Sequence, residues 1–481
     1  MTAKVITILA ILVVLLCGAG FKVAQARSTA TKRTPSKSTR KSVRAYVSHS
    51  TAHFAAKPVG EHAQVAGEPL TITIDAARTY QSIVGFGGAF TDAACYMFDR
   101  LPADSRKTLF AELFGKDAMQ LNVNRVCLGS SDYATHVYSY CDGPADPELT
   151  RFSLDHDRKY ILPILKEARS INPEIFLFGS PWSPPGWMKS NKSMLGGNMQ
   201  RRYMSSYAHY FLKFLQGYAA AGVPVQAVTV QNEVDTDQDG KMPACAWPQE
   251  YEVDFVRHHL GPVLRAAGQD TQIWIIDHNY NLWGRALGSL DTEGLTDYAS
   301  AIAWHGYVGD ATRIDTVKQA YPAIDMYWTE GGPDYTDPNY KTDWCKWGRS
   351  FTSNLRNHCR AITVWNLALD EQGRPNIGPF PCGGLVTIDS QTGAISHSGQ
   401  YYALGQFSRH VKRGAIRIGS ESLKGTDTDS ICHVAFVNPD GEKVLVVTNS
   451  GGARALALVV DQDTTVSVDV DADSVTTFVW R

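Results

Sequence analysis

The sequence predicts an α/β protein made of a (β/α)₈ TIM barrel with an attached antiparallel β-sandwich. Eight short apolar runs alternate with amphipathic stretches along the middle of the chain, as strands and helices alternate in such a barrel. After Tyr401 the pattern changes to short alternating segments separated by turn residues, which is typical of a sandwich. A similar segment, Leu70–Asp75, precedes the barrel and is expected to complete the sandwich sheet.

Composition supports a globular protein with more than one domain. The 481 residues can bury a large core, and 44% of them are hydrophobic. The net charge of −2 gives no case for nucleic acid or an acidic polymer as a partner. The 11 tryptophans and 21 tyrosines fit sugar binding, although large cores also use aromatic residues.

Residues 1–26 are predicted to be a signal peptide, with Lys4 before an apolar run from Val5 to Leu16 and a cleavage site at Ala24–Ala26. The apolar run is short for a membrane span, so no stable membrane insertion is expected after cleavage. The protein is therefore expected to be secreted or periplasmic. An uncleaved anchor and a lipoprotein acylated at Cys17 are the alternatives.

Residues 27–66 are rich in Ser, Thr, Ala, Lys and Arg and carry no acidic residue before Glu61. This composition predicts a flexible basic linker, because it offers little apolar surface to bury. Attachment to an acidic envelope is the functional alternative to a solvated spacer.

No metal or cofactor is expected. The chain has no C-x-x-C pair and no H-E-x-x-H motif, so no structural zinc site is predicted. The acidic segment Asp235–Gly240 resembles the start of a calcium loop, but Ala246 stands where such a loop needs glutamate, which leaves a solvated acidic loop. Disulfide pairing among the cysteines cannot be deduced from their spacing, and Cys127, inside an apolar run, is expected to be a buried thiol.

The barrel is expected to occupy residues 83–398, after a sandwich strand in residues 67–82. Its predicted strands are Ile83–Gly87, Val123–Leu128, Ile175–Phe178, Val225–Val230, Gln272–Ile276, Ala301–Trp304, Met326–Thr329 and Ala361–Trp365. The clearest predicted helices are Asp104–Leu113, His156–Ser170, Tyr203–Ala221 and Pro248–Ala267. A doubly wound open sheet is the competing fold, but Gly85–Gly88 is not followed by a glycine-rich phosphate loop.

The sandwich is expected to occupy residues 399–481 together with the early strand. Turn signals at Asn438–Gly441 and Asn449–Gly452 separate its short segments. The predicted strands are Ala415–Ile418, Ile431–Asn438, Lys443–Thr448, Ala455–Val460, Thr465–Val470 and Ser474–Trp480.

Two glutamates follow predicted barrel strands at the end where barrels place their active sites. Glu233 follows the fourth strand and Glu330 the seventh, so they are expected to face each other across the barrel. Glycosidic cleavage needs such a pair: one carboxyl group protonates the leaving oxygen, and the other attacks or stabilises the anomeric carbon. A single strand-end glutamate is equally well explained by a structural salt bridge, but the pair favours a glycosidase.

Three polar residues are expected beside the pair. Asn232 would hydrogen-bond the sugar 2-hydroxyl, and Arg125 would keep a nearby carboxylate ionised. Asp92 follows a glycine-rich turn and would bind two sugar hydroxyls, with a helix N-cap as the alternative.

Four ring-bearing side chains are also candidates for the site. Trp182 and Trp365 would form walls of a sugar site, with core packing as the alternative. His305 and Tyr307 would orient the nucleophile or line the pocket, and a hydrogen-bonded core histidine explains His305 almost as well.

From about Leu70 to Arg481 the chain resembles glycoside hydrolase family 30, in the branch that includes lysosomal acid β-glucosidase (glucosylceramidase). The resemblance rests on Gly85–Asp92, Ser180–Trp182, Asn232–Glu233, Thr329–Glu330, Trp365–Leu369 and Tyr401–Ser408. It implies retaining hydrolysis with Glu233 as acid/base and Glu330 as nucleophile. It also implies that the terminal glucose and the nucleophile are surrounded by Asp92, Trp182, Asn232, Trp365, Arg125 and Tyr307.

The loops Val234–Trp247 and Asn376–Gly384 depart from the human-type pattern and would shape the leaving-group side. The sequence therefore predicts an exported exo-acting β-glucosidase of glucosylceramidase type, acting without a cofactor on a β-glucoside or glycolipid. A β-xylosidase, a β-fucosidase, a β-1,6-glucanase and a catalytically silent carbohydrate-binding protein are the alternatives. The oligomeric state stays open.

Overall fold

The computed structural model describes residues 42–59, 68–422, 429–461 and 464–481. The predicted signal peptide, residues 1–26, and residues 27–41 and 60–66 of the predicted linker lie outside these ranges. Within them, no helix is both long and apolar enough to cross a membrane.

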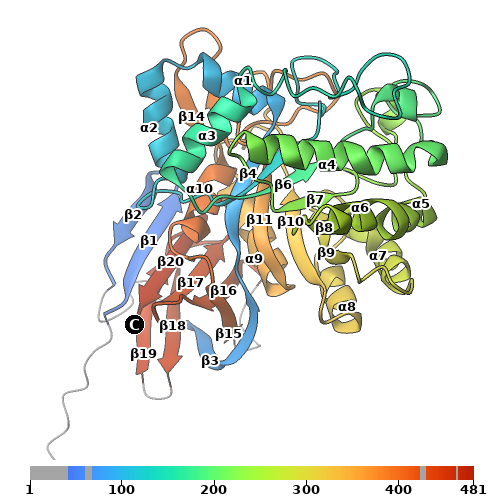
Figure 1. Cartoon of the computed structure of the whole chain (residues 1–481). Helices are drawn as coiled ribbons and strands as arrows, with labels where there is room; N and C mark the ends of the chain where they lie inside the picture. Colours follow the sequence, from blue (N-terminus) through green and yellow to red (C-terminus); the bar gives the residue numbers. More distant parts are fainter. Residues whose placement is uncertain (1–41, 60–67, 423–428, 462–463) are drawn as a thin grey trace, which may run out of the picture. The chain divides into compact units, whose positions relative to one another are not determined.

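The predicted fold class is confirmed. Eight parallel strands close a barrel in which each strand pairs with the next along the chain and β11 pairs with β4 (Figure 1). All eight predicted strands are present, as β4 (Gly85–Phe90), β5 (Val123–Cys127), β6 (Phe176–Ser180), β7 (Ala227–Thr229), β8 (Gln272–Asn279), β9 (Ala299–His305), β10 (Asp325–Glu330) and β11 (Cys359–Asn366).

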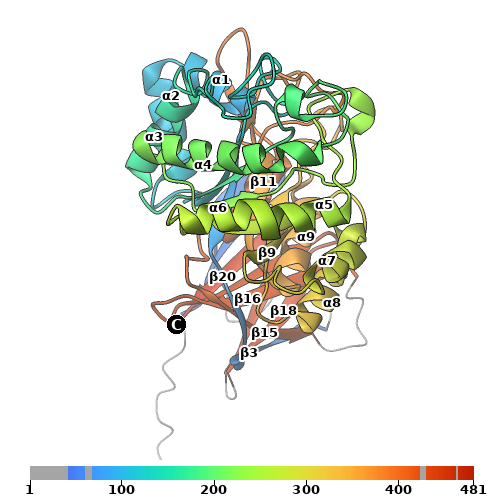
Figure 2. The ribbon, with the colours of Figure 1, turned by 45° about the vertical axis from the view of Figure 1, so that its right-hand side comes forward.

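Helices surround the barrel, and α4, α5 and α6 lie across one part of its outer side (Figure 2). The α-helices are α1 (Asp92–Arg100), α2 (Ala103–Phe114), α3 (Ile161–Ile171), α4 (Met204–Ala220), α5 (Gln249–Asp254), α6 (Gly261–Ala266), α7 (Trp283–Leu290), α8 (Thr312–Ala320), α9 (Trp344–Arg356) and α10 (Gly399–Ser408). A π-helical turn, Phe255–Leu260, joins α5 to α6, so the predicted helix Pro248–Ala267 is one element. Short 3₁₀ turns occur at Gly186–Met188, Arg201–Tyr203, Gln238–Gly240 and Tyr280–Leu282.

Side chains fill the amino-terminal part of the barrel interior. Trp274 of β8 stacks on Tyr327 of β10 with ring centroids 4.1 Å apart, and Phe178 of β6 packs 5.0 Å from the same indole. All three rings are buried. This packed layer closes one end of the barrel, so the space for a site lies at the carboxyl ends of the strands.

The second sheet combines both parts of the chain, as predicted. Strand β3 (Leu70–Ser82) lies between β15 and β18, antiparallel to the first and parallel to the second. The C-terminal strands match their predicted positions, as β15 (Ile416–Ser422), β16 (Ile431–Val437), β17 (Lys443–Asn449), β18 (Arg454–Asp461), β19 (Thr464–Val470) and β20 (Ser474–Trp480). A small separate sheet holds β12 (Ala368–Leu369), β13 (Val386–Ile388) and β14 (Ile395–His397).

The prediction of a flexible linker is wrong for residues 44–57. Strands β1 (Arg44–His49) and β2 (Ala52–Lys57) form a hairpin at the edge of the nine-stranded sheet. Its first strand, β1, pairs antiparallel with β20. Ala45 and Val47 are buried there, and Tyr46 stacks on His410 at 4.6 Å. These small apolar side chains gain burial only through pairing with a strand more than 400 residues away, which composition does not reveal.

The cysteines of the described residues are free thiols, and most are buried. Cys127 is among the buried ones, as predicted, and burial raises the pKa of its thiol. None of these cysteines forms a disulfide in the described part of the chain.

Candidate active site

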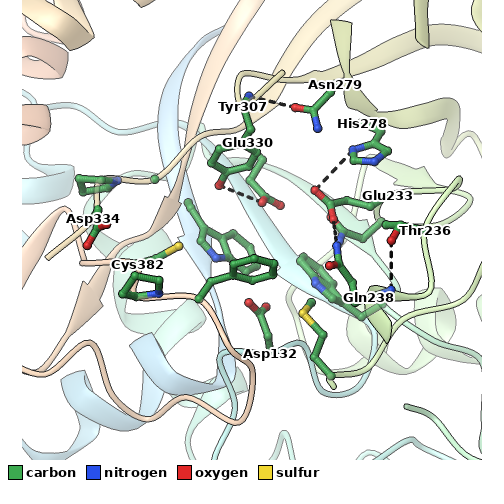
Figure 3. A pocket seen from close by; sticks show the side chains of 18 residues that line it. Asp132, Glu233, Thr236, Gln238, His278, Asn279, Tyr307, Glu330, Asp334 and Cys382 are labelled. Atoms are coloured by element: carbon green, nitrogen blue, oxygen red, sulfur yellow. Dashed lines mark hydrogen bonds and ion pairs between the residues drawn. The ribbon is translucent and has the colours of Figure 1, made fainter. Parts of the chain in front are cut away.

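A cavity of about 470 Å³ opens at the carboxyl ends of the barrel strands (Figure 3). Both predicted glutamates contribute to its wall. Four other predicted site residues line it as well: Trp182, Asn232, Tyr307 and Trp365. The two indoles stack with centroids 4.9 Å apart and form part of the cavity wall. That this wall binds a sugar stays a prediction.

Glu330 is the last residue of β10, and two donors fix its carboxylate. Arg125 Nη1 donates to Oε2 at 2.5 Å, and Tyr307 Oη donates to Oε1 at 3.1 Å. Burial raises the pKa of Glu330, while His305 and Arg125 oppose that rise. The carboxylate is thus held in one orientation by a cation and a hydroxyl, which is the arrangement a nucleophile needs.

Asp277 contacts both Arg125 and His305, the two cations that lie beside the glutamates. It is completely buried, and it accepts hydrogen bonds from Arg125 Nη2 at 2.6 Å and from Thr329 Oγ1 at 2.8 Å. His305 Nε2 lies 2.9 Å from Oδ1, the oxygen that also accepts from Thr329. Burial alone would raise the pKa of Asp277, but Arg125 and His305 outweigh it and hold that pKa well below its usual range.

His305 contacts three carboxylates and does not line the cavity. Its Nδ1 lies 3.4 Å from Glu233 Oε1, and its Nε2 lies 3.8 Å from Glu330 Oε2. Burial opposes the charged imidazole, but Glu330, Asp277 and Glu233 together raise the pKa of His305 to about 9. Of the two predicted roles, the structure supports positioning of the glutamates and not lining of the pocket.

Glu233 follows β7 and has a left-handed backbone conformation with φ of 57°. Its N–H donates to Asp277 O at 2.9 Å, which compensates part of the cost of this conformation. Gln238 Nε2 donates to Oε2 at 2.6 Å (Figure 3). Burial raises the pKa of Glu233, but His305, His278 and Gln238 outweigh it and lower that pKa.

The two glutamates titrate as a pair. The charge on Glu233 raises the pKa of Glu330, because both carboxyl groups are buried in one cavity and share His305 as a neighbour. Such a pair retains one proton more readily than two separate carboxyl groups. One ionised and one protonated carboxyl group are what general acid catalysis combined with nucleophilic attack requires.

A bulge in β8 brings two successive side chains into the site. The register of β8 against β9 shifts between Ile276 and His278, and Ile276 and Asp277 have positive φ values of 75° and 44°. The buried carboxylate of Glu252 accepts the Ile276 N–H at 2.8 Å, and Arg285 in turn binds Glu252. Without the bulge, Asp277 and His278 would point to opposite faces of the strand.

The sequence predicts that Asp92 binds sugar, but the structure does not place it in the cavity wall. It is the first residue of α1, and Thr91 is the N-cap, so the alternative of an Asp92 cap is wrong. The Asp92 carboxylate accepts from Tyr160 Oη and from Thr135 N, and lies 2.6 Å from His156 Nε2. Its oxygens are occupied by these partners, and Asp92 is not among the residues that line the cavity.

Asp132, and not Asp92, is the aspartate near the strand ends that lines the cavity. It is only 4% exposed, and its Oδ1 has no hydrogen-bond partner in the described part of the chain. Burial, together with the charges of Glu330 and Glu233, raises the pKa of Asp132. An unpaired carboxyl oxygen in a buried wall costs free energy that a ligand hydroxyl can recover.

The two loops that depart from the human-type pattern, Val234–Trp247 and Asn376–Gly384, both border the cavity. Phe380, Pro381 and Cys382 line it from the second loop, and Tyr133 Oη fixes this loop through Phe380 O at 2.7 Å and Cys382 N at 2.8 Å. The first loop contributes Thr236, Gln238 and Met242.

Sequence reasoning missed Asp277, His278 and Gln238. The first two directly follow the core of the fifth predicted strand, so the rule that searches strand ends could have found them. Asp132 stands near the end of the second strand, where the same rule applies. No sequence signal marks Gln238, because its contact depends on the conformation of the irregular loop after Glu233.

Family models match both parts of the chain. Residues 83–411 match the glycosyl hydrolase family 30 TIM-barrel domain, and residues 414–478 match the family 30 β-sandwich domain. An endo-1,6-β-D-glucanase of Neurospora crassa is 34% identical over 399 residues, covering 80% of this chain and 82% of the relative. The lysosomal acid glucosylceramidase of Mus musculus is 29% identical over 439 residues, covering 86% and 84%.

Solved structures agree with these matches. The endo-β-1,6-glucanase BT3312 has a TM-score of 0.83 and 30% identity, covering 91% of this chain and 99% of that chain. SrfJ from Salmonella typhimurium has a TM-score of 0.85 and 27% identity, covering 92% and 100%. The similarity therefore includes the barrel and the sheet together.

Proposed function

Since the chain belongs to glycosyl hydrolase family 30, we propose that it hydrolyses β-1,6-glucosidic bonds of a glucan with retention of anomeric configuration. The observation that carries this proposal is the placement of Glu233 and Glu330 in one cavity, with Arg125 and Tyr307 fixing the second carboxylate. The family relationship makes the chain a glycosidase. The linkage and the mechanism are the proposed part.

In the proposed first step, Glu330 attacks the anomeric carbon as a carboxylate and Glu233 gives its proton to the leaving oxygen. Because the pKa of Glu330 is raised and that of Glu233 is lowered in the free enzyme, the shared proton has to pass from Glu330 to Glu233 when the substrate binds. A covalent glucosyl-enzyme forms, and the glucan fragment departs as an alcohol. In the second step, Glu233 removes a proton from water, the resulting hydroxide displaces Glu330, and the sugar leaves with its original configuration. Asn232 Oδ1 accepts from Arg125 at 2.8 Å, so its NH₂ group is the donor for the sugar 2-hydroxyl.

We favour a glucan over a glycolipid as the substrate because of the names of two relatives. The Neurospora crassa relative is named an endo-1,6-β-D-glucanase, and BT3312 is likewise named an endo-β-1,6-glucanase. The sequence alone favoured an exo-acting glucosidase of glucosylceramidase type, and the mouse relative keeps that second candidate open. One structural feature supports it: Tyr307, Val308 and Phe380 are 42–53% exposed, and the first and last line the cavity, where a lipid leaving group could pack.

The test is a comparison of kcat/KM on linear β-1,6-glucan, on β-1,3-glucan and on glucosylceramide in detergent. The proposal expects β-1,6-glucan to be the best of the three. A preference for glucosylceramide would support the second candidate. Comparison of kcat/KM on the aryl β-glucoside, β-xyloside, β-fucoside and β-galactoside identifies the sugar that the site accepts. No turnover on any substrate would indicate a silent carbohydrate-binding protein.

Asp132 is proposed to bind hydroxyls of the glucosyl unit held between the glutamates. Asp132→Ala is expected to lower kcat/KM for an aryl β-glucoside by about 10- to 100-fold, the cost of losing two hydrogen bonds to the sugar. Asp92→Ala is the matched comparison. It removes the partner of His156 and Tyr160, so it is expected to lower the unfolding temperature and leave KM unchanged. An Asp132 variant with wild-type kcat/KM would contradict this assignment.

Export is also proposed, on the signal-like pattern of residues 1–26. Expression in a secreting host should release a protein whose first residue is Arg27. Mass spectrometry of the mature N-terminus checks this, and an intact Met1 in the purified cellular protein would contradict it.

A further inference from the structure

The imidazoles of His278, on β8, and His305, on β9, both point at the carboxylate of Glu233. His278 Nδ1 and His305 Nδ1 each lie 3.4 Å from Glu233 Oε1, and the three ligand atoms all lie within 4.8 Å of one another. We propose that Glu233, His278 and His305 form an inhibitory binding site for a zinc-like divalent cation. Occupation of this site removes the acid/base group from the reaction.

The two imidazole–carboxylate distances suit a tetrahedral ion. In a tetrahedral zinc site with metal–ligand bonds of about 2.1 Å, two ligand atoms lie about 3.4 Å apart. Both imidazole–carboxylate distances already have this length. Two histidines and one glutamate, with a fourth position left to water or substrate, form a ligand set that proteins use for zinc.

Each imidazole is oriented through its other nitrogen. His278 Nε2 lies 2.8 Å from Asp235 Oδ1, and His305 Nε2 lies 2.9 Å from Asp277 Oδ1. A carboxylate that accepts the second N–H of a histidine fixes its tautomer and makes the free nitrogen a better ligand. In both rings it is the Nδ1 atom that faces Glu233 Oε1.

The His278 ring shows why a cation fits here. His278 is 8% exposed, and its Nδ1 has no hydrogen-bond partner in the described part of the chain. With the N–H on the Asp235 side, the bare lone pair of Nδ1 faces the Glu233 carboxylate. Two electron-rich atoms at this distance repel each other unless a proton or a metal ion lies between them.

The cavity gives access, and the ligand types give selectivity. Glu233 and His278 line the cavity, so an ion reaches the site from solvent (Figure 3). Two imidazole nitrogens favour Zn²⁺, Cu²⁺ or Co²⁺, whereas Mg²⁺ and Ca²⁺ prefer sites made of oxygen atoms.

Titration of the full-length protein with Co²⁺ alone tests the site without any substrate. One equivalent is expected to produce the visible absorption of a tetrahedral Co²⁺ complex, and Zn²⁺ is expected to displace it. His278→Ala should weaken binding at least about tenfold, as loss of a metal ligand does. His278→Gln is the second variant in case alanine disturbs packing, and the exposed His258→Ala is the matched control that should bind like the wild type.

Inhibition is the second readout, and it rests on the proposed function. Micromolar Zn²⁺ is expected to lower kcat reversibly, with recovery after a chelator is added. Absence of the Co²⁺ band, or equal binding by wild type and both His278 variants, would overturn the metal site. A protein that binds Co²⁺ as expected but hydrolyses no glucoside would contradict the proposed function and leave the metal site supported.

Discussion

Glu330→Gln is expected to lower kcat/KM on aryl β-glucosides by at least about 10⁴-fold, since losing a nucleophile removes the covalent step. The amide keeps the size of the side chain and an oxygen that accepts from Arg125 or Tyr307. It cannot displace an alcohol from the anomeric carbon. Initial rates on a rapidly cleaved aryl glucoside measure the loss, with the unfolding temperature as a check on folding.

Asp334→Asn is the matched control for this prediction. Asp334 follows the same strand by four residues and lines the same cavity, but it is exposed and makes its hydrogen bonds within its own loop. Its substitution is expected to change kcat/KM by less than about tenfold. If the Glu330 variant performed as well as the Asp334 variant, Glu330 would not be the nucleophile.

Glu233→Ala is expected to lower kcat/KM most for substrates whose leaving group must be protonated. For a glucose disaccharide, whose leaving alcohol must be protonated, kcat/KM should fall by about 10²- to 10⁴-fold. For a dinitrophenyl glucoside, whose leaving group departs as a stable anion, formation of the glucosyl-enzyme should change little. The comparison of both substrates on one variant serves as its own control for folding.

Azide gives a second readout for the Glu233 variant. Without a general base, water reacts slowly with the glucosyl-enzyme, whereas azide attacks without losing a proton. Added azide is expected to raise turnover of the dinitrophenyl glucoside and to yield a β-glucosyl azide. Equal losses on both substrates, with no effect of azide, would mean that Glu233 has a structural role.

Much of the fold could be predicted because its signals are local. The barrel strands are buried on both faces and therefore appear as apolar runs, and the C-terminal strands alternate and end at turn residues. The hairpin of β1 and β2 could not be predicted, because Ala45 and Val47 become buried only against β20. Long-range pairing of this kind leaves no pattern in the segment itself.

The site was predictable only where strand ends alone position the side chain. Glu233 and Glu330 follow that rule. Asp92 and Asp132 both stand near strand ends, and their difference depends on His156 and Tyr160, more than 60 residues away in the sequence, which bind the Asp92 carboxylate. Strand periodicity likewise hides the bulge at Ile276, which turns both Asp277 and His278 towards the site.

The central claim is that Glu330 forms a covalent intermediate that Glu233 helps to form and to resolve. The most direct test is ¹H NMR of the sugar released in the first minutes of hydrolysis, before mutarotation. Double displacement predicts that the β-anomer appears first and the α-anomer follows slowly. Initial release of the α-anomer would show a single displacement by water and would contradict the account.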